Sequence, residues 1–199
     1  MKTKDYKYWE KKISQKINQL WQKSNKFLPC HGPSHHWRVW KNAEKFGKKK
    51  GADLEILVAS CLLHDLAAFN KSPINGHNLQ SAKIAKSVLE SINFPKEKIK
   101  VVCGIISTHR SGKKQAGGLE GDIMKAFDKV DTLGPMGVYR IITPMSIRGY
   151  DLTTIVKWFL TDGKVKRKWQ AIKFPEIKRQ YRSDYLYTLN FFKKLAKFK

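Results

Sequence analysis

Four residues with metal-binding side chains interrupt apolar stretches of this 199-residue sequence. They are His35, the adjacent pair His64 and Asp65, and Asp128. The pair ends the apolar run LEILVASCLLH at 54–64, and Asp128 lies within AFDKVD. A buried carboxylate is destabilising by several kcal/mol unless a cation or hydrogen-bond donors receive it. Two imidazoles and two carboxylates suit Mn²⁺, Fe²⁺, Co²⁺ or Zn²⁺ and leave positions open for water, which is the composition of a hydrolytic site.

These residues also have a structural interpretation that needs no metal. A His–Asp pair also occurs as a helix cap or as a core pair. We expect His36 to be an exposed neighbour of His35 and His31 at most to support a ligand. Asp131 shares a helix face with Asp128, so it can orient a ligand, bind a substrate hydroxyl or cap the break at Gly134.

The elements that position these residues are predicted to be helices. Apolar residues recur at three- and four-residue spacing, which is typical of amphipathic helices. The expected helices cover 6 to about 27–29, 33–51, 54–64, 79–92, 96–109, 122–133, 136–143, 151–160 and 176–198. Loops are expected at 70–78 and 110–121. A buried strand is the alternative for 54–64, but no alternating strand pattern occurs, so the predicted fold class is all-α.

Six short motifs carry a resemblance to a known family. They are SHHWRV at 34–39, GAD at 51–53, LLHD at 62–65, HNLQSA at 77–82, THR at 108–110 and DKVDTLGPMGVYR at 128–140. Their order resembles the H…HD…D signature of the HD-domain metal-dependent phosphohydrolases, in particular the small single-domain bacterial members. The resemblance implies a helical bundle of the HD type forming one domain over 1–199. Its motif-bearing core covers about 31–140, between basic helical flanks at 1–30 and 150–199.

The resemblance implies hydrolysis of phosphate esters or anhydrides, often in nucleotides, with a divalent Mn, Mg, Co, Fe or Zn ion as cofactor. His35, His64, Asp65 and Asp128 match the family's metal ligands, and Asp65 can also orient or deprotonate the attacking water. The expected substrate-binding residues are Arg38, His77, His109, Arg110, Lys113, Lys114 and Asp131. Among them, His77, His109 and Arg110 are implied by the resemblance as phosphate binders or ligands to a second metal.

The sequence departs from the family pattern at three places. Gly32 stands where many members have Asp, and Asn78 stands where Glu often follows the histidine equivalent to His77. Both changes remove carboxylates expected to support the site. The segment 66–69 (LAAF) replaces the acidic pair of members that hydrolyse alarmones, so alarmone hydrolysis is disfavoured.

The charge of the chain indicates an anionic partner. Forty Lys and Arg against 16 Asp and Glu give a net charge of +24. Residues 1–30 carry eight basic and two acidic side chains, and 163–199 carry twelve and two. This excess supports a phosphorylated small molecule, for example a nucleotide, as substrate, and makes nucleic acid bound by the basic flanks a further candidate partner.

Two other functions stay open beside the phosphohydrolase. One is a basic nucleic-acid-binding protein, or a nucleic-acid phosphodiesterase using the same HD site. The other is a dinuclear HD oxygenase, which would need iron and His77 or His109 as extra ligands. Three cysteines without Cys-x-x-Cys spacing and a polar N-terminus predict a cytoplasmic protein, and no segment approaches the ~20 apolar residues needed to span a membrane.

Overall fold

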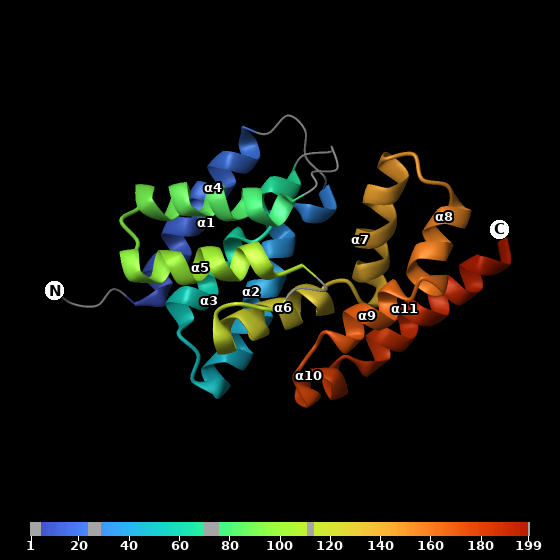
Figure 1. Cartoon of the computed structure of the whole chain (residues 1–199). Helices are drawn as coiled ribbons and strands as arrows, with labels where there is room; N and C mark the ends of the chain where they lie inside the picture. The colour runs from blue at the N-terminus through green and yellow to red at the C-terminus, as the bar shows by residue number, and fades with distance from the viewer. Residues whose placement is uncertain (1–4, 24–28, 70–75, 111–113, 199) are drawn as a thin grey trace. The chain divides into compact units, whose positions relative to one another are not determined.

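The computed structural model describes residues 5–23, 29–69, 76–110 and 114–198, and these are helical or lie in short connections (Figure 1). No β-strand occurs in these ranges, which confirms the predicted all-α fold class. The segment with the strand alternative, 54–64, is a helix. Over the same ranges, no helix is both long and apolar enough to cross a membrane.

The chain divides into two compact units, residues 1–127 and 128–199. The first contains α1 (Tyr6–Gln22), η1 (Pro29–His31), α2 (Pro33–Lys50), α3 (Leu54–Leu63), η2 (Leu66–Phe69), α4 (His77–Ser91), α5 (Lys96–Thr108) and most of α6 (Gly118–Val130). The division falls inside α6, whose last three residues belong to the second unit. The single-domain organisation expected from the length stays a prediction.

Helix α3 is the central element of the first unit. Its residues from Leu57 to Leu63 are all buried, because the segment is apolar on every side and α1, α2 and α5 pack around it. The Asp53 carboxylate caps the helix by accepting hydrogen bonds from the Glu55 and Ile56 amides at 2.9 and 3.2 Å. A Cβ at Gly47 of α2 would lie 2.6 Å from Leu57 Cδ2, so glycine permits the close approach of α2 and α3.

Helices α4 and α5 pack against each other and are joined by a short turn at residues 92–95 (Figure 1). Within this turn Asn93 has a left-handed backbone, with φ of 56°. At the other end of the pair, the Asn78 side-chain amide donates a hydrogen bond to the Ser107 carbonyl. The first turn of α4 is therefore tied to the last turn of α5, where the histidines of both helices lie.

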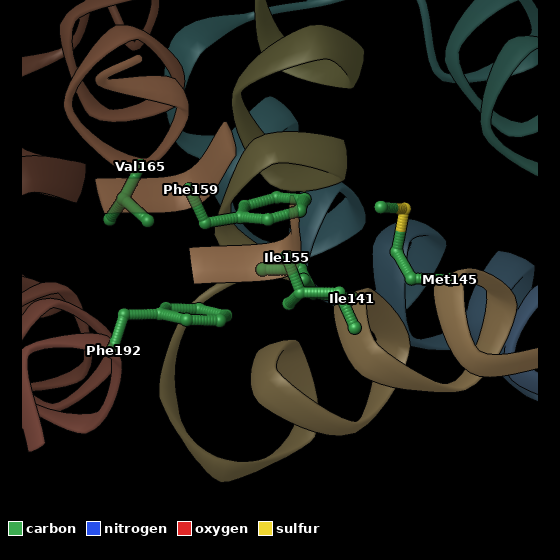
Figure 2. Close-up of a cluster of buried hydrophobic side chains, with 6 residues drawn as sticks. All are labelled: Ile141, Met145, Ile155, Phe159, Val165 and Phe192. Atoms are coloured by element: carbon green, nitrogen blue, oxygen red, sulfur yellow. The ribbon is translucent and has the colours of Figure 1, made fainter. Parts of the chain in front are cut away.

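The second unit is built from helices around its own apolar core. They are α7 (Gly134–Ile147), α8 (Leu152–Val156), the π-helix η3 (Lys157–Thr161), α9 (Lys164–Gln170), α10 (Pro175–Gln180), α11 (Arg182–Leu195) and η4 (Ala196–Phe198). Figure 2 shows the core residues, which are Ile141, Met145, Ile155, Phe159, Val165 and Phe192. The Phe159 and Phe192 rings stack with centroids 5.3 Å apart, so η3 and α11 are held together by aromatic packing.

The observed helices differ from the predicted ones mainly in the second unit. Helix α9 was not expected, because five of its residues at 164–168 read as a basic surface run. The expected helix over 176–198 is divided at Tyr181 into α10 and α11. In the first unit, α1 ends at Gln22, and the predicted end at 27–29 falls largely outside the described residues.

Candidate metal centre

His35 and His64 bring two imidazole nitrogens together in the interior of the first unit. His35 lies in the first turn of α2, just after Pro33, and His64 follows the last residue of α3. Both side chains are fully buried, and their Nε2 atoms are 3.1 Å apart. Neighbouring ligand atoms of one divalent ion bound at ~2.1 Å lie roughly 3 Å apart, so this separation suits a shared ion.

His64 and His109 are oriented in the same way at the ends of two helices. His64 Nδ1 donates a hydrogen bond to the Cys61 carbonyl at 2.9 Å, and His109 Nδ1 donates to the Ile106 carbonyl at 2.6 Å. In each case the ring bonds the carbonyl three residues earlier, which leaves Nε2 as the atom available to a ligand. The negative ends of the α3 and α5 dipoles lie beside these rings and favour a cation.

The Asp65 carboxylate lies between two sets of histidines. Its Oδ2 is 3.7 Å from His64 Nε2 and 3.9 Å from His35 Nε2. Its Oδ1 is 3.2 Å from His109 Nε2 and 3.7 Å from His77 Nε2. One carboxylate therefore faces two separate groups of nitrogen donors, one with each oxygen.

Asp128 completes the first group from α6, the helix that continues across the division between the units. One ligand atom from each of His35, His64, Asp65 and Asp128 lies within 4.8 Å of the others, and all four residues are buried. Asp65, His77 and His109 form a second group by the same measure. Nitrogen and carboxylate donors in this mixture fit a divalent metal ion, because imidazoles suit ions such as Zn²⁺ and Fe²⁺ and carboxylates suit ions such as Mn²⁺ and Mg²⁺.

His36 corrects the expectation of an exposed neighbour. It is fully buried, and its Nδ1 donates to the Leu62 carbonyl at 2.7 Å. Burial, followed by repulsion from His64 and His35, lowers the pKa of His36 well below its ordinary value, so the ring is neutral. The hydrogen bond ties α2 to the last turn of α3 and thereby positions His35 against His64.

Two of the three departures from the family pattern, Gly32 and Asn78, are explained by packing in the first unit. A Cβ on Gly32 would lie 2.7 Å from Cη2 of Trp21, so the indole occupies the space that an aspartate would need. Asn78 is buried and donates to the Ser107 carbonyl, a bond that a glutamate carboxylate is unable to donate.

The remaining predicted substrate-binding residues differ in burial and in their distance from the cluster. Arg38 is partly buried on α2, one turn beyond His35, whereas Arg110 and Lys114 are exposed. Lys113 lies outside the described residues. The structure brings His77 and His109 to the cluster but does not draw Arg110 or Lys114 into its interior.

Asp131 lies in the second unit and pairs with a residue that the sequence analysis did not single out. Arg140 Nη1 donates to Asp131 Oδ2 at 3.0 Å, and Arg140 is buried on α7. Asp131 thus has a buried arginine as a neighbour, and its expected role at the site stays a prediction. The sequence contained a signal for Arg140, which stands between Val138 and Ile141 in an apolar helix. A charged residue in an apolar helix was also the criterion that identified Asp128.

Comparison with known proteins identifies solved structures of the same fold. None of the curated proteins matches the sequence. A protein from Lactobacillus plantarum shares the fold with a TM-score of 0.78 and 18% identity over 99% of this chain and 98% of its own. Bacillus subtilis YpgQ, solved in complex with ADP, has a TM-score of 0.73 and 20% identity over 98% of this chain and 96% of its own. An HD-superfamily hydrolase from Bacillus thuringiensis has a TM-score of 0.68 and 21% identity over 97% of both chains.

The sequence also matches a family model, that of the HD domain, over residues 34–133. This segment covers half of the chain and contains His35, His64, Asp65 and Asp128, the four residues that meet in the first group. The resemblance predicted from the motifs is thereby confirmed at the level of the family. With that match and the shared helical architecture, the chain belongs to the HD-domain family.

Proposed function

We propose that this protein is a metal-dependent phosphohydrolase acting on a nucleotide or a related phosphorylated small molecule. The observation that carries the proposal is the convergence of His35, His64, Asp65 and Asp128 in a buried group. A divalent ion held by these four residues would polarise a phosphate oxygen and ionise a bound water near neutral pH. The net charge of +24 also favours an anionic substrate such as a phosphorylated molecule.

Asp65 would be the catalytic residue in this proposal. Its Oδ2 faces the first histidine pair, whereas its Oδ1 points toward His109 and His77. With Oδ2 used as a ligand, Oδ1 can accept a proton from the attacking water or orient it. His109 and His77 would in turn orient this oxygen or bind the phosphate, and Arg38 can form a fork to a second phosphate oxygen.

The nucleotide as substrate class is supported by a structural neighbour. Bacillus subtilis YpgQ has been solved with ADP, and its fold covers nearly all of this chain. Together with a buried site of phosphate-binding chemistry, this makes nucleotides the first substrates to test. We place the reaction in the cytoplasm, as the cysteine pattern predicts.

The second group of donors favours one alternative reaction. Asp65, His77 and His109 lie within 4.8 Å of one another, so a second ion is compatible with the same carboxylate. Two iron ions in these groups would permit an oxygenase instead of a hydrolase. Metal analysis combined with measurement of O₂ consumption separates the two functions, because only the oxygenase both needs iron and consumes O₂.

The decisive experiment combines a nucleotide panel with three forms of the protein. We expect the wild type to release phosphate or pyrophosphate from at least one nucleotide with Mn²⁺, Mg²⁺ or Co²⁺. Asp65→Asn and His64→Ala should each lower turnover by about 10³-fold or more, because they remove groups that act as a unit. Their metal content, measured by mass spectrometry after gel filtration, should fall in parallel.

Asp162→Asn is the matched control, since Asp162 is exposed and lies outside both donor groups. It should retain the metal content and the turnover of the wild type. Circular dichroism should show all variants folded. A wild type that is no faster than Asp65→Asn on every nucleotide and metal would overturn the proposed function.

A further inference from the structure

An open groove runs along the outer face of α11 in the second unit. It follows the second half of the helix into η4, toward the red end of the chain in Figure 1. Its volume is about 510 Å³, which is within the usual range of ligand sites. The residues that line this α11 groove recur at three- and four-residue spacing and so share one helix face. They are Tyr187, Asn190, Phe191, Lys193, Lys194 and Lys197.

The inner face of α11 fixes the direction in which the groove faces. Phe192 is fully buried in the core of Figure 2, and Thr188, one turn earlier, is fully buried as well. The Thr188 hydroxyl accepts a hydrogen bond from the Gly134 amide at 2.8 Å, which ties α11 to the start of α7. Tyr187 and Phe198 remain 46% and 79% exposed. The helix is therefore anchored on one side and presents aromatic rings to solvent on the other.

The α11 groove carries positive charge that no acidic side chain offsets. Residues 185–198 include three lysines and neither Asp nor Glu. Within the described part of the chain, no carboxylate lies at ion-pair distance from Lys193, Lys194 or Lys197. The acidic residue that precedes them on α11, Asp184, is in the first turn and faces Gly134, on which a Cβ would lie 2.8 Å from Asp184 Oδ1. The partner that complements this groove is therefore an anion.

The combination of rings and lysines narrows the class of anion. Lys193 and Lys194 lie in the last turn of α11, where positive charge also favours the helix dipole, but the dipole does not account for exposed rings. Tyr187 and Phe191 are one turn apart, ~6 Å along the helix axis, and the lysines follow in the next turn. Sites for single-stranded nucleic acid join these two features, because lysines bind the phosphate backbone while aromatic rings stack on unpaired bases.

An anionic membrane fits the α11 groove less well. A helix that lies on a membrane inserts a continuous apolar face between the lipids. On α11 the face of Phe192 is occupied by the protein core, and the outer face alternates rings with lysines and Asn190. The Asn190 amide carries both donors and acceptors, which suit the edge of a base.

We propose that the α11 groove binds single-stranded nucleic acid. Lys193, Lys194 and Lys197 contact its phosphates, and its bases stack against Tyr187 and Phe191. All of these residues lie outside both donor groups of the candidate metal centre, so binding in the groove needs neither metal nor hydrolysis. The proposal therefore adds a second binding function that does not depend on the proposed phosphohydrolase.

The first test measures the affinity of the full chain for labelled oligouridylate and oligodeoxyuridylate by fluorescence anisotropy in EDTA. The double variant Lys193→Gln/Lys197→Gln should raise the Kd about tenfold. It should also lower the slope of log affinity against log salt concentration by about 1.4, because each phosphate contact to a single strand contributes about 0.7. The matched control Lys45→Gln/Lys49→Gln removes two exposed charges at the same four-residue spacing from α2 and should change the Kd less than about twofold.

The second test concerns the ring. Tyr187→Ala should raise the Kd about tenfold through lost stacking, whereas Tyr187→Phe should keep it within about twofold of the wild type. Tyr139→Ala removes a ring of nearly equal exposure, 47%, from α7 and should leave the Kd unchanged. A duplex of the same length should bind Tyr187→Ala and wild type equally, because its bases are already stacked on one another. Circular dichroism should show every variant folded.

Several results would overturn the groove as a nucleic-acid site. One is a wild type that binds neither oligonucleotide, and another is equal weakening by the two lysine double variants, which would mean general attraction by the basic surface. A third is loss of sedimentation with phosphatidylserine–phosphatidylcholine vesicles in Lys193→Gln/Lys197→Gln while oligonucleotide affinity stays constant, which would assign the groove to an anionic membrane. Dependence on both the lysines and Tyr187 supports the site, and the oligonucleotide that shows it identifies RNA or DNA as the source.

Discussion

Buried charge is handled differently in the two units of this protein. In the first unit, Glu10 and Glu44 are each 8% exposed and are surrounded by lysines whose side chains stay about half exposed. Lys41 Nζ lies 3.0 Å from Glu10 Oε1, and Lys48 Nζ lies 3.0 Å from Glu44 Oε1. In the second unit, Lys168 is directed inward without a carboxylate at ion-pair distance among the described residues.

Buried charge therefore has a different effect on stability in each unit. Acidic groups of the first unit are satisfied by lysines that keep much of their hydration, so the arrangement stabilises the contact between α1 and α2. In the second unit, burial and neighbouring cations lower the pKa of Lys168, so the charge of this side chain opposes folding. Substitution of Glu10 and Glu44 should therefore reduce stability, whereas removal of the Lys168 charge should not.

The largest effect on stability is expected from removing both carboxylates of the first unit. The double variant Glu10→Gln/Glu44→Gln leaves Lys7, Lys41 and Lys48 without their anions and breaks several charge-assisted hydrogen bonds. We expect a loss of about 2 kcal/mol in the free energy of unfolding, reduced from the value for fully buried pairs because the lysines are exposed. Urea denaturation followed by circular dichroism measures it.

The control for this variant is Glu90→Gln. Glu90 pairs with Lys86 at 3.8 Å on the surface, where both side chains are more than half exposed. Its loss should change stability by less than about 0.5 kcal/mol. Equal effects of the control and the double variant would contradict the stabilising role of the Glu10 and Glu44 network.

A second, smaller effect is the acid sensitivity of the same network. Burial alone would raise the pKa of Glu44, but hydrogen bonds from Lys48, Lys7 and Tyr6 outweigh it and lower the pKa to about 2. A carboxyl group with a depressed folded pKa contributes its full stability above its ordinary pKa of 4.5 and loses it as the pH falls toward 2. Wild type and double variant should therefore converge in stability between pH 4.5 and 2, and urea midpoints at several pH values test this. A constant difference would contradict it.

The smallest effect, and one of opposite sign, is expected for the stability of Lys168→Met. Methionine retains the apolar stem beside Phe159 and removes a charge that burial and repulsion disfavour. We expect the free energy of unfolding to stay constant or rise by up to about 1 kcal/mol, measured by thermal and urea denaturation without ligand. A drop of more than 1 kcal/mol would show that Lys168 stabilises the fold and would remove the contrast between the units.

Helical periodicity was sufficient to predict the fold class and most helices, because each helix buries an apolar face. It failed for α9, where lysine and arginine residues surround Val165 and obscure the apolar positions. The same reasoning identified His35, His64, Asp65 and Asp128, since polar groups in apolar helices need partners. It misjudged His36, because adjacent histidines in a sequence do not reveal which helix covers each of them.

The sequence by itself determined which residue types are available for chemistry and that helices present them. Residues 29 positions apart, such as His35 and His64, meet only when α2 packs on α3, and the tertiary structure decided this contact. It also decided which oxygen of Asp65 faces which histidines, that Arg140 pairs with Asp131, and that Lys168 is directed inward. Such choices depend on contacts between distant segments, which local propensity and spacing do not encode.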